Sequence, residues 1–181
     1  DSMKARSAVL ASSVVAAIAG AIGGTIAPAD DRTGLVAPDL GQFETAGVGD
    51  YLDHRCGSMD CHGQATRNLI LYGCYGLRLD PNQTGLVPGC RASGGINTQT
   101  QEYEASYRSV VALEPAVMTA VVNGGGAHPE LLTLIRKARG WDAHKGGALV
   151  TPGDDQDNCL TSWLAGNADS TACTNAISDT P

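Results

Sequence analysis

Hydrophobic positions follow two patterns along the chain, one long unbroken segment and a series of shorter periodic ones. The unbroken segment covers residues 7–29, contains no charged residue and follows Lys4 and Arg6. Its length is close to the roughly 20 apolar residues that span a bilayer. We therefore expect a single transmembrane helix within residues 1–29, with a secretory signal that ends near Ala27 and Ala29 as the alternative.

Charges beside this segment predict its orientation. Lys4 and Arg6 favour a cytoplasmic N-terminal end, which places the following residues on the periplasmic or outer side of the cytoplasmic membrane. Ala16, Gly20 and Gly24 recur at a spacing of four and would leave one helix face smooth enough for a partner helix. Residues 30–41 are expected to form a linker, and residues 42–181 the folded domain.

The folded domain is expected to be mainly α-helical with long loops. Apolar residues recur at helical spacing in several short segments, which cover residues 48–55, 102–113, 115–122, 129–139 and 155–165. Pro115 and Pro129 are typical of the first position of a helix. A small hairpin around residues 73–76 is predicted by alternating leucines at positions 69, 71, 77 and 79.

Composition and net charge bear on how the core is filled and on which partners the protein binds. A chain of 181 residues has room for one ordinary core, yet aromatic residues make up only 4% of it, which leaves little bulk to fill that core. The formal net charge of −7 argues against a nucleic-acid partner and favours docking onto a basic protein surface.

Six cysteines indicate an exported protein, because a reducing cytosol disfavours disulfides. Four of them lie outside the motif described next and allow three pairings. We expect Cys74 to pair with Cys90 and Cys159 with Cys173, since each pairing closes a loop of about 15 residues.

The remaining two cysteines belong to the segment Cys56-Gly-Ser-Met-Asp-Cys61-His62. It resembles the haem-attachment motif of c-type cytochromes, in which two thiols bind the porphyrin and the adjacent histidine binds the iron. Four residues separate the cysteines here, where two are usual. A Cys56–Cys61 disulfide with an uninvolved His62, or half of a zinc site, are the alternatives.

The order of elements between residues 42 and 166 resembles the cytochrome c fold, in which the first and last helices cross. Three segments are also similar to cytochrome c-like domains of planctomycete and deltaproteobacterial membrane or periplasmic proteins, namely residues 131–137, 144–147 and 159–166. In those domains a His-x-Gly-Gly stretch stands where ordinary cytochromes c place a methionine ligand. The resemblance implies one covalently attached haem c.

His62 is then the proximal ligand, and the sixth position of the iron needs an occupant. We favour His144, in a loop made flexible by the glycines at 146 and 147, with Met118 and His128 as alternatives. Met118 also suits plain core filling and His128 a helix N-cap. His54 and Met59 lie too close to the attachment segment for the opposite face of a porphyrin.

These inferences predict a membrane-anchored monohaem cytochrome that carries single electrons between redox proteins of a membrane complex and is not an enzyme. A haem sensor or enzyme with an open distal site, and a haem-free, disulfide-linked structural subunit, are the alternatives. The sequence contains no hydrolase, phosphate-binding or metalloprotease motif. Possible partners for the haem propionates are Arg67, Arg78 and Arg91.

Overall fold

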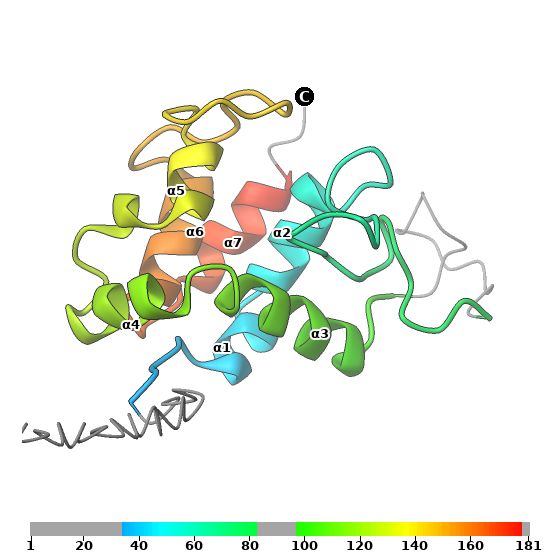
Figure 1. Ribbon diagram of the computed structural model, residues 1–181, viewed down its shortest axis with the longest axis horizontal. Coiled ribbons are helices and arrows are strands. Elements are labelled where there is room, and N and C mark those ends of the chain that lie inside the picture. Colours follow the sequence, from blue (N-terminus) through cyan, green and yellow to red (C-terminus); the bar gives the residue numbers. More distant parts are fainter. Residues whose placement is uncertain (1–33, 83–96, 179–181) are drawn as a thin grey trace, which may run out of the picture. The chain divides into compact units, whose positions relative to one another are not determined.

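The computed structural model describes residues 34–82 and 97–178 (Figure 1). The chain divides into two units, Asp1–Arg32 and Thr33–Pro181, and the described residues belong to the second. Within those ranges no helix is both long enough and apolar enough to cross a bilayer. The expected anchor in residues 1–29, together with Cys90 and Arg91, lies outside the described residues.

The described part of the chain is mainly α-helical and contains no strand, in agreement with the predicted class. Its elements, in chain order, are α1 (Leu40–Thr45), α2 (Val48–Cys56), α3 (Thr100–Val111), α4 (Pro115–Asn123), the 3-10 helix η1 (Pro129–Leu131), α5 (Thr133–Ala138), α6 (Asp155–Leu164) and α7 (Ser170–Ser178). Helices α2, α3, α4 and α6 agree with the predicted segments to within two residues at each end.

The helix expected over residues 129–139 is broken. Leu132 has an extended backbone, with ψ of 130°, and separates η1 from α5. The break is stabilised from outside the segment, because the Glu114 carboxylate accepts hydrogen bonds from the Thr133 backbone nitrogen at 2.6 Å and from its hydroxyl at 2.8 Å. A helix whose first amide is satisfied in this way can start anew at Thr133.

Helix α1 was not predicted, since residues 30–41 were expected to be linker. Asp39 caps α1 by accepting a 2.7 Å hydrogen bond from the Gln42 nitrogen. The preceding backbone is held by distant aromatic side chains: the Tyr107 hydroxyl donates to the Pro38 carbonyl, and the Trp163 indole to the Asp39 carbonyl. Residues from about 36 onward therefore pack on the folded unit.

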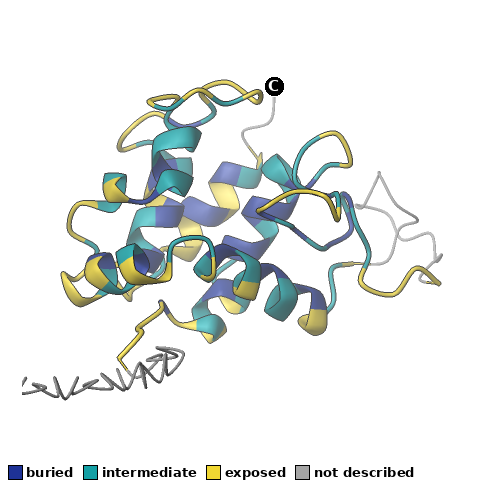
Figure 2. Ribbon diagram, viewed as in Figure 1, coloured by how far each residue is buried: buried dark blue, intermediate teal, exposed yellow. Residues whose placement is uncertain are grey.

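Helix α7 was also not predicted, although its disulfide was. Cys173 in α7 is joined to Cys159 in α6, which confirms that pairing. The second expected pairing involves Cys90, outside the described residues. Helix α2 packs against both α6 and α7, and Figure 2 shows buried residues along all three helices.

The predicted hairpin around residues 73–76 does not form. Only isolated bridges occur there, between Tyr72 and Leu77 and between Ser58 and Gly76. Serine hydroxyls of α3 accept the hydrogen bonds that a second strand would have accepted, from the backbone nitrogens of Ile70 and Tyr72. The segment is thus a loop fixed to a helix, and of its alternating leucines Leu69 and Leu71 are buried, whereas Leu79 is 46% exposed.

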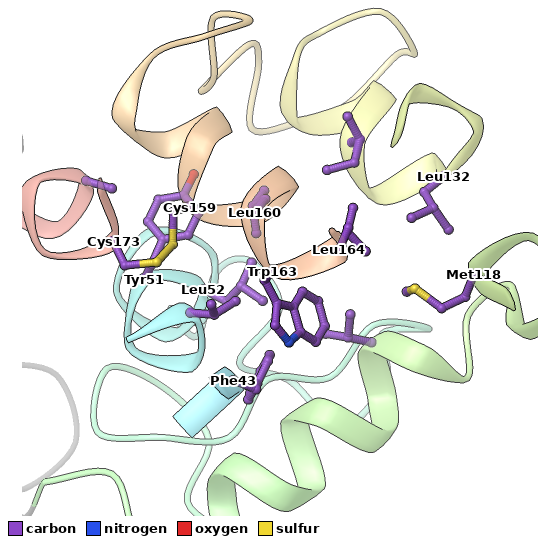
Figure 3. Close-up of a cluster of buried hydrophobic side chains, with 14 of the residues drawn as sticks. Phe43, Tyr51, Leu52, Met118, Leu132, Cys159, Leu160, Trp163, Leu164 and Cys173 are labelled. Atoms are coloured by element: carbon purple, nitrogen blue, oxygen red, sulfur yellow. A yellow bond between two sulfur atoms is a disulfide. The ribbon is translucent and has the colours of Figure 1, made fainter. Parts of the chain in front are cut away.

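An aromatic cluster occupies the centre of the core. Trp163 is fully buried, with ring centroids 5.2 Å from Phe43 and 6.2 Å from Tyr107. Figure 3 shows Trp163 and Phe43 together, with the leucines of α6 nearby; the Cys159–Cys173 disulfide and Tyr51 overlap at the left of this view. Phe43, Tyr107 and Trp163 thus form one cluster, and the neighbouring Leu160 and Leu52 also form part of a cavity wall.

Candidate functional site

Helix α2 ends at the first cysteine of the predicted attachment segment. Cys56 is its last residue, and the Gly57 nitrogen closes the helix by donating to the Asp53 carbonyl at 2.9 Å. The chain then folds back, because the His62 nitrogen donates to the Cys56 carbonyl at 2.9 Å. This turn needs a glycine at position 63, where a Cβ atom would collide with the Gly57 carbonyl.

The two thiols of this turn are free. Cys56 and Cys61 are both half-buried and are not joined in a disulfide. Burial raises the pKa of the Cys56 thiol to about 12, with a further contribution from Cys61. The Cys56 thiol is therefore protonated at neutral pH, and the turn presents two unpaired sulfurs beside His62.

The His62 ring is oriented by the backbone. Its Nδ1 lies 3.1 Å from the Leu69 carbonyl oxygen, which accepts only if Nδ1 carries the proton, so Nε2 is left with its lone pair. Burial lowers the pKa of His62, and the nearby His144 and Arg67 lower it further, against the opposing effect of the Leu69 hydrogen bond. A neutral imidazole with one nitrogen held by a carbonyl is the usual state of a metal-binding histidine.

His144 faces His62 from a different part of the chain. The ring centroids are 5.9 Å apart and the ring planes differ by 21°. The Nδ1 atom of His144 is buried and has no hydrogen-bond partner in the described part of the protein. A buried nitrogen without a partner is costly. The His144 ring itself lines both cavities that His62 lines.

Gly146 sets how closely the His144 ring can lie against its own loop. A Cβ atom at position 146 would be 3.1 Å from Cε1 of His144 and 3.4 Å from Nδ1. Any side chain there would press on the ring. Gly146 is therefore needed for the His144 ring to pack against its own loop. Gly147 has a φ of 75°, a left-handed conformation that favours glycine.

Two consecutive residues of α5 hold the loop just before His144. The Arg136 Nε donates to the Asp142 carboxylate at 2.8 Å, and the Lys137 ammonium donates to the Ala143 carbonyl at 2.9 Å. After His144 the chain returns to the same helix, where the Leu149 nitrogen donates to the Ala138 carbonyl at 2.9 Å. The loop is thus anchored to α5 at both ends.

The two imidazoles line a space between α2, α5 and α6. One cavity of about 420 Å³ has His62 and His144 in its wall together with core residues such as Tyr51 and Leu160. A second cavity, of about 400 Å³, contains both cysteines and both histidines in its wall. These volumes lie in the range of cofactor-sized cavities, and the inner part is apolar.

The other predicted distal ligands lie elsewhere. Met118 is buried in the core at 2% exposure and lines neither cavity. The His128 side chain is 76% exposed and its Nδ1 lies 3.1 Å from Glu130. His54 packs edge-on against Tyr75 and lines a separate cavity, while Met59 is 50% exposed. The described structure brings only His144 to face His62.

The expected arginines differ in placement. Arg67 lines both cavities and donates to the carbonyls of Cys61 and Asp60. Arg78 is instead buried in a two-pronged ion pair with Glu102, with both contacts at 2.8 Å, and it lines neither cavity. Two aspartates at the start of α6 have structural roles: Asp154 caps the helix, and Asp157 pairs with Arg139 at 2.8 Å.

Sequence reasoning missed Lys137 as part of the site. A lysine on a short amphipathic helix has no distinguishing signal, and only the return of the loop to α5 brings its ammonium beside His144. The role of Gly146 in packing against the ring was also missed, although the Gly-Gly pair itself was noted.

The chemistry of these residues fits one haem with covalent attachment. The donor set that such a group needs is present: two free thiols, and two imidazoles whose ring centroids are 5.9 Å apart. Across the described ranges, no group of three or more His, Cys, Asp or Glu side chains is arranged to hold a metal ion. Comparisons with protein-family models, curated proteins and solved structures found no match for this chain.

Proposed function

We propose that this protein is a monohaem c-type cytochrome that carries single electrons. Cys56 and Cys61 would hold the porphyrin through thioether bonds, with His62 and His144 as axial ligands. The single observation that carries the proposal is the pair of imidazoles, His62 and His144, with ring centroids 5.9 Å apart in one cavity wall beside the two free thiols.

The haem, when bound, supplies an iron that alternates between two oxidation states. The chain's own part is to hold both imidazoles in place through Leu69 and through the loop anchored on α5. Two neutral imidazoles favour a lower reduction potential than a histidine and a methionine. Leu52, Leu134 and Leu160 exclude water from the inner wall of the cavity.

The proposal also includes the cellular location of the protein and the class of its partners. The uncharged apolar segment of residues 7–29, after Lys4 and Arg6, and the Cys159–Cys173 disulfide support a haem domain on the outer side of the cytoplasmic membrane. The partners would be redox proteins of a membrane complex.

The deciding experiment is a pyridine haemochrome spectrum of the purified protein, coupled to intact mass. Two thioether bonds predict an absorption band of the reduced haemochrome at about 550 nm, and one covalent haem adds about 616 Da to the mass of the chain. Cys56→Ser should move the band a few nanometres to the red, because one thioether remains, whereas Ser58→Ala in the same turn should leave it in place. A full-length protein without haem, expressed together with a cytochrome c maturation system, would refute the proposal.

A further inference from the structure

The lysines and arginines of the described ranges fall into two groups, those that form an ion pair and those that do not. Four are neutralised by a carboxylate, in the pairs Arg78–Glu102, Arg108–Glu104, Arg136–Asp142 and Arg139–Asp157. The other four make no ion pair within those ranges, and they are Arg55, Arg67, Lys137 and Lys145. The division follows position in the fold, because all four unpaired cations line the same cavity.

That cavity is the 400 Å³ one that contains Cys56 and Cys61, and we refer to its four cations as the basic face. Asp60 is the only carboxylate in the same wall. Arg67 and Lys145 are exposed, while Arg55 and Lys137 are half-buried. A local excess of positive charge thus surrounds the site in a protein whose formal net charge is −7.

Haem propionates do not account for the whole basic face. Thioether bonds and propionates lie at opposite edges of a c-type haem, so cations next to the attachment cysteines are at the edge without carboxylates. Arg55 directly precedes Cys56, and the Arg67 Nε donates to the Cys61 carbonyl at 3.0 Å. These two cations are available to a different anionic group.

We propose that the basic face is the docking surface for an acidic patch of a redox partner protein. This inference rests on the proposed function, and it reverses the expectation from net charge, which favoured a basic partner. Electrons cross protein interfaces near the cofactor, and the same cavity wall contains His62 and His144. Unpaired charges around such an opening steer a complementary partner to it, and the effect is screened by salt.

The first test uses a decaglutamate peptide as the acidic probe and the full chain in detergent. NMR titration at low ionic strength should shift the backbone amides of Arg55, Arg67, Lys137 and Lys145, and the shifts should vanish at about 0.5 M salt. Shifts confined to other surfaces, or none at all, would overturn the proposal. The measurement does not depend on haem, so it separates this proposal from the proposed function.

A matched pair of variants sharpens the test. Lys145→Glu and Arg108→Glu change the net charge equally, and Arg108 lies on α3, paired with Glu104, away from the cavity. Lys145→Glu should weaken peptide binding roughly threefold or more, whereas Arg108→Glu should change it little. Equal weakening by both variants would show that only net charge matters and would refute a specific surface.

Charged redox reagents provide a second readout. Despite the net charge of −7, oxidation by anionic hexacyanoferrate should slow as salt is added, and oxidation by the hexaammineruthenium cation should accelerate. The reverse dependence would contradict a positive electron-exit surface. A protein without haem would show no haem band that changes with either reagent, which would count against the proposed function alone.

Discussion

The imidazole rings of His62 and His144 face each other with centroids 5.9 Å apart, although one follows helix α2 and the other lies in the loop after α5. Each ring is held by different means. A carbonyl oxygen fixes His62, while two side chains of α5 fix the loop that carries His144. A cofactor between these rings would therefore join two separately supported parts of the domain.

Replacement of His144 tests this relationship most directly. In His144→Ala the haem should remain attached through Cys56 and Cys61, but the sixth position should open, so the reduced protein should bind carbon monoxide within seconds. The wild-type protein should bind it slowly or not at all. His128→Ala removes an exposed histidine and serves as the control. A six-coordinate spectrum without carbon monoxide binding in His144→Ala would exclude His144 as the ligand.

Gly146→Val tests whether the ring needs the missing side chain of position 146. A Cβ there would be 3.1 Å from the His144 ring, so the ring should shift and its bond to the iron should weaken. We expect partial carbon monoxide binding and a changed midpoint potential. Gly124→Ala, at the C-cap of α4 with an ordinary φ of −78°, should leave both unchanged. Identical behaviour of the two variants would mean that Gly146 has no part in orienting the ring.

Glu102→Gln should be among the most destabilising single changes. Glu102 is 1% exposed and binds Arg78 through both oxygens while also accepting from the Leu79 and Gln99 nitrogens. Loss of its charge would remove one partner of a buried ion pair, at about 3–5 kcal/mol of unfolding free energy.

Glu104→Gln is the matched control, since Glu104 is 40% exposed and forms an i,i+4 pair with Arg108 worth about 0.5 kcal/mol or less. Chemical denaturation would measure both variants. Similar losses in the two would show that the buried ion pair contributes no more than an exposed one.

The buried Asp53 predicts how stability depends on pH. Burial raises the pKa of Asp53 to about 6, against the lowering effect of the hydrogen bond from the Thr98 hydroxyl, and Asp50 adds to the rise. Because the folded-state pKa exceeds the unfolded value, the stabilisation from the protonated form is fully present below about pH 4 and is lost as the pH rises through about 6.

Asp53→Asn should remove that decline, because an amide does not titrate. The free energy of unfolding would be measured at pH 4.5 and at pH 7.5. The difference between the two values should be smaller in Asp53→Asn than in the wild type. Asp80→Asn, which neutralises an exposed carboxylate, should leave the difference as it is in the wild type. A decline of equal size in Asp53→Asn would assign the pH dependence to other groups.

The sequence by itself determined the features that depend on neighbours along the chain. Apolar spacing located α2, α3, α4 and α6, and the adjacency of Cys61 and His62 identified the candidate attachment turn. A loop of about 15 residues was enough to favour the Cys159–Cys173 pairing, which α6 and α7 bring together. Local steric preference, helical periodicity and short loop closure all act over a few residues, so a sequence pattern records them.

Tertiary structure decided whatever depends on groups far apart in the chain. The Glu114 carboxylate stabilises the break in the helix expected over 129–139, and hydroxyls of α3 bind the segment of the expected hairpin. The same holds for the site, because His144 was one candidate among several until the anchored loop placed it opposite His62. The cations gather around the cavity only in the folded chain, since Coulomb energy depends on distance in space, whereas net charge is a sum over the sequence.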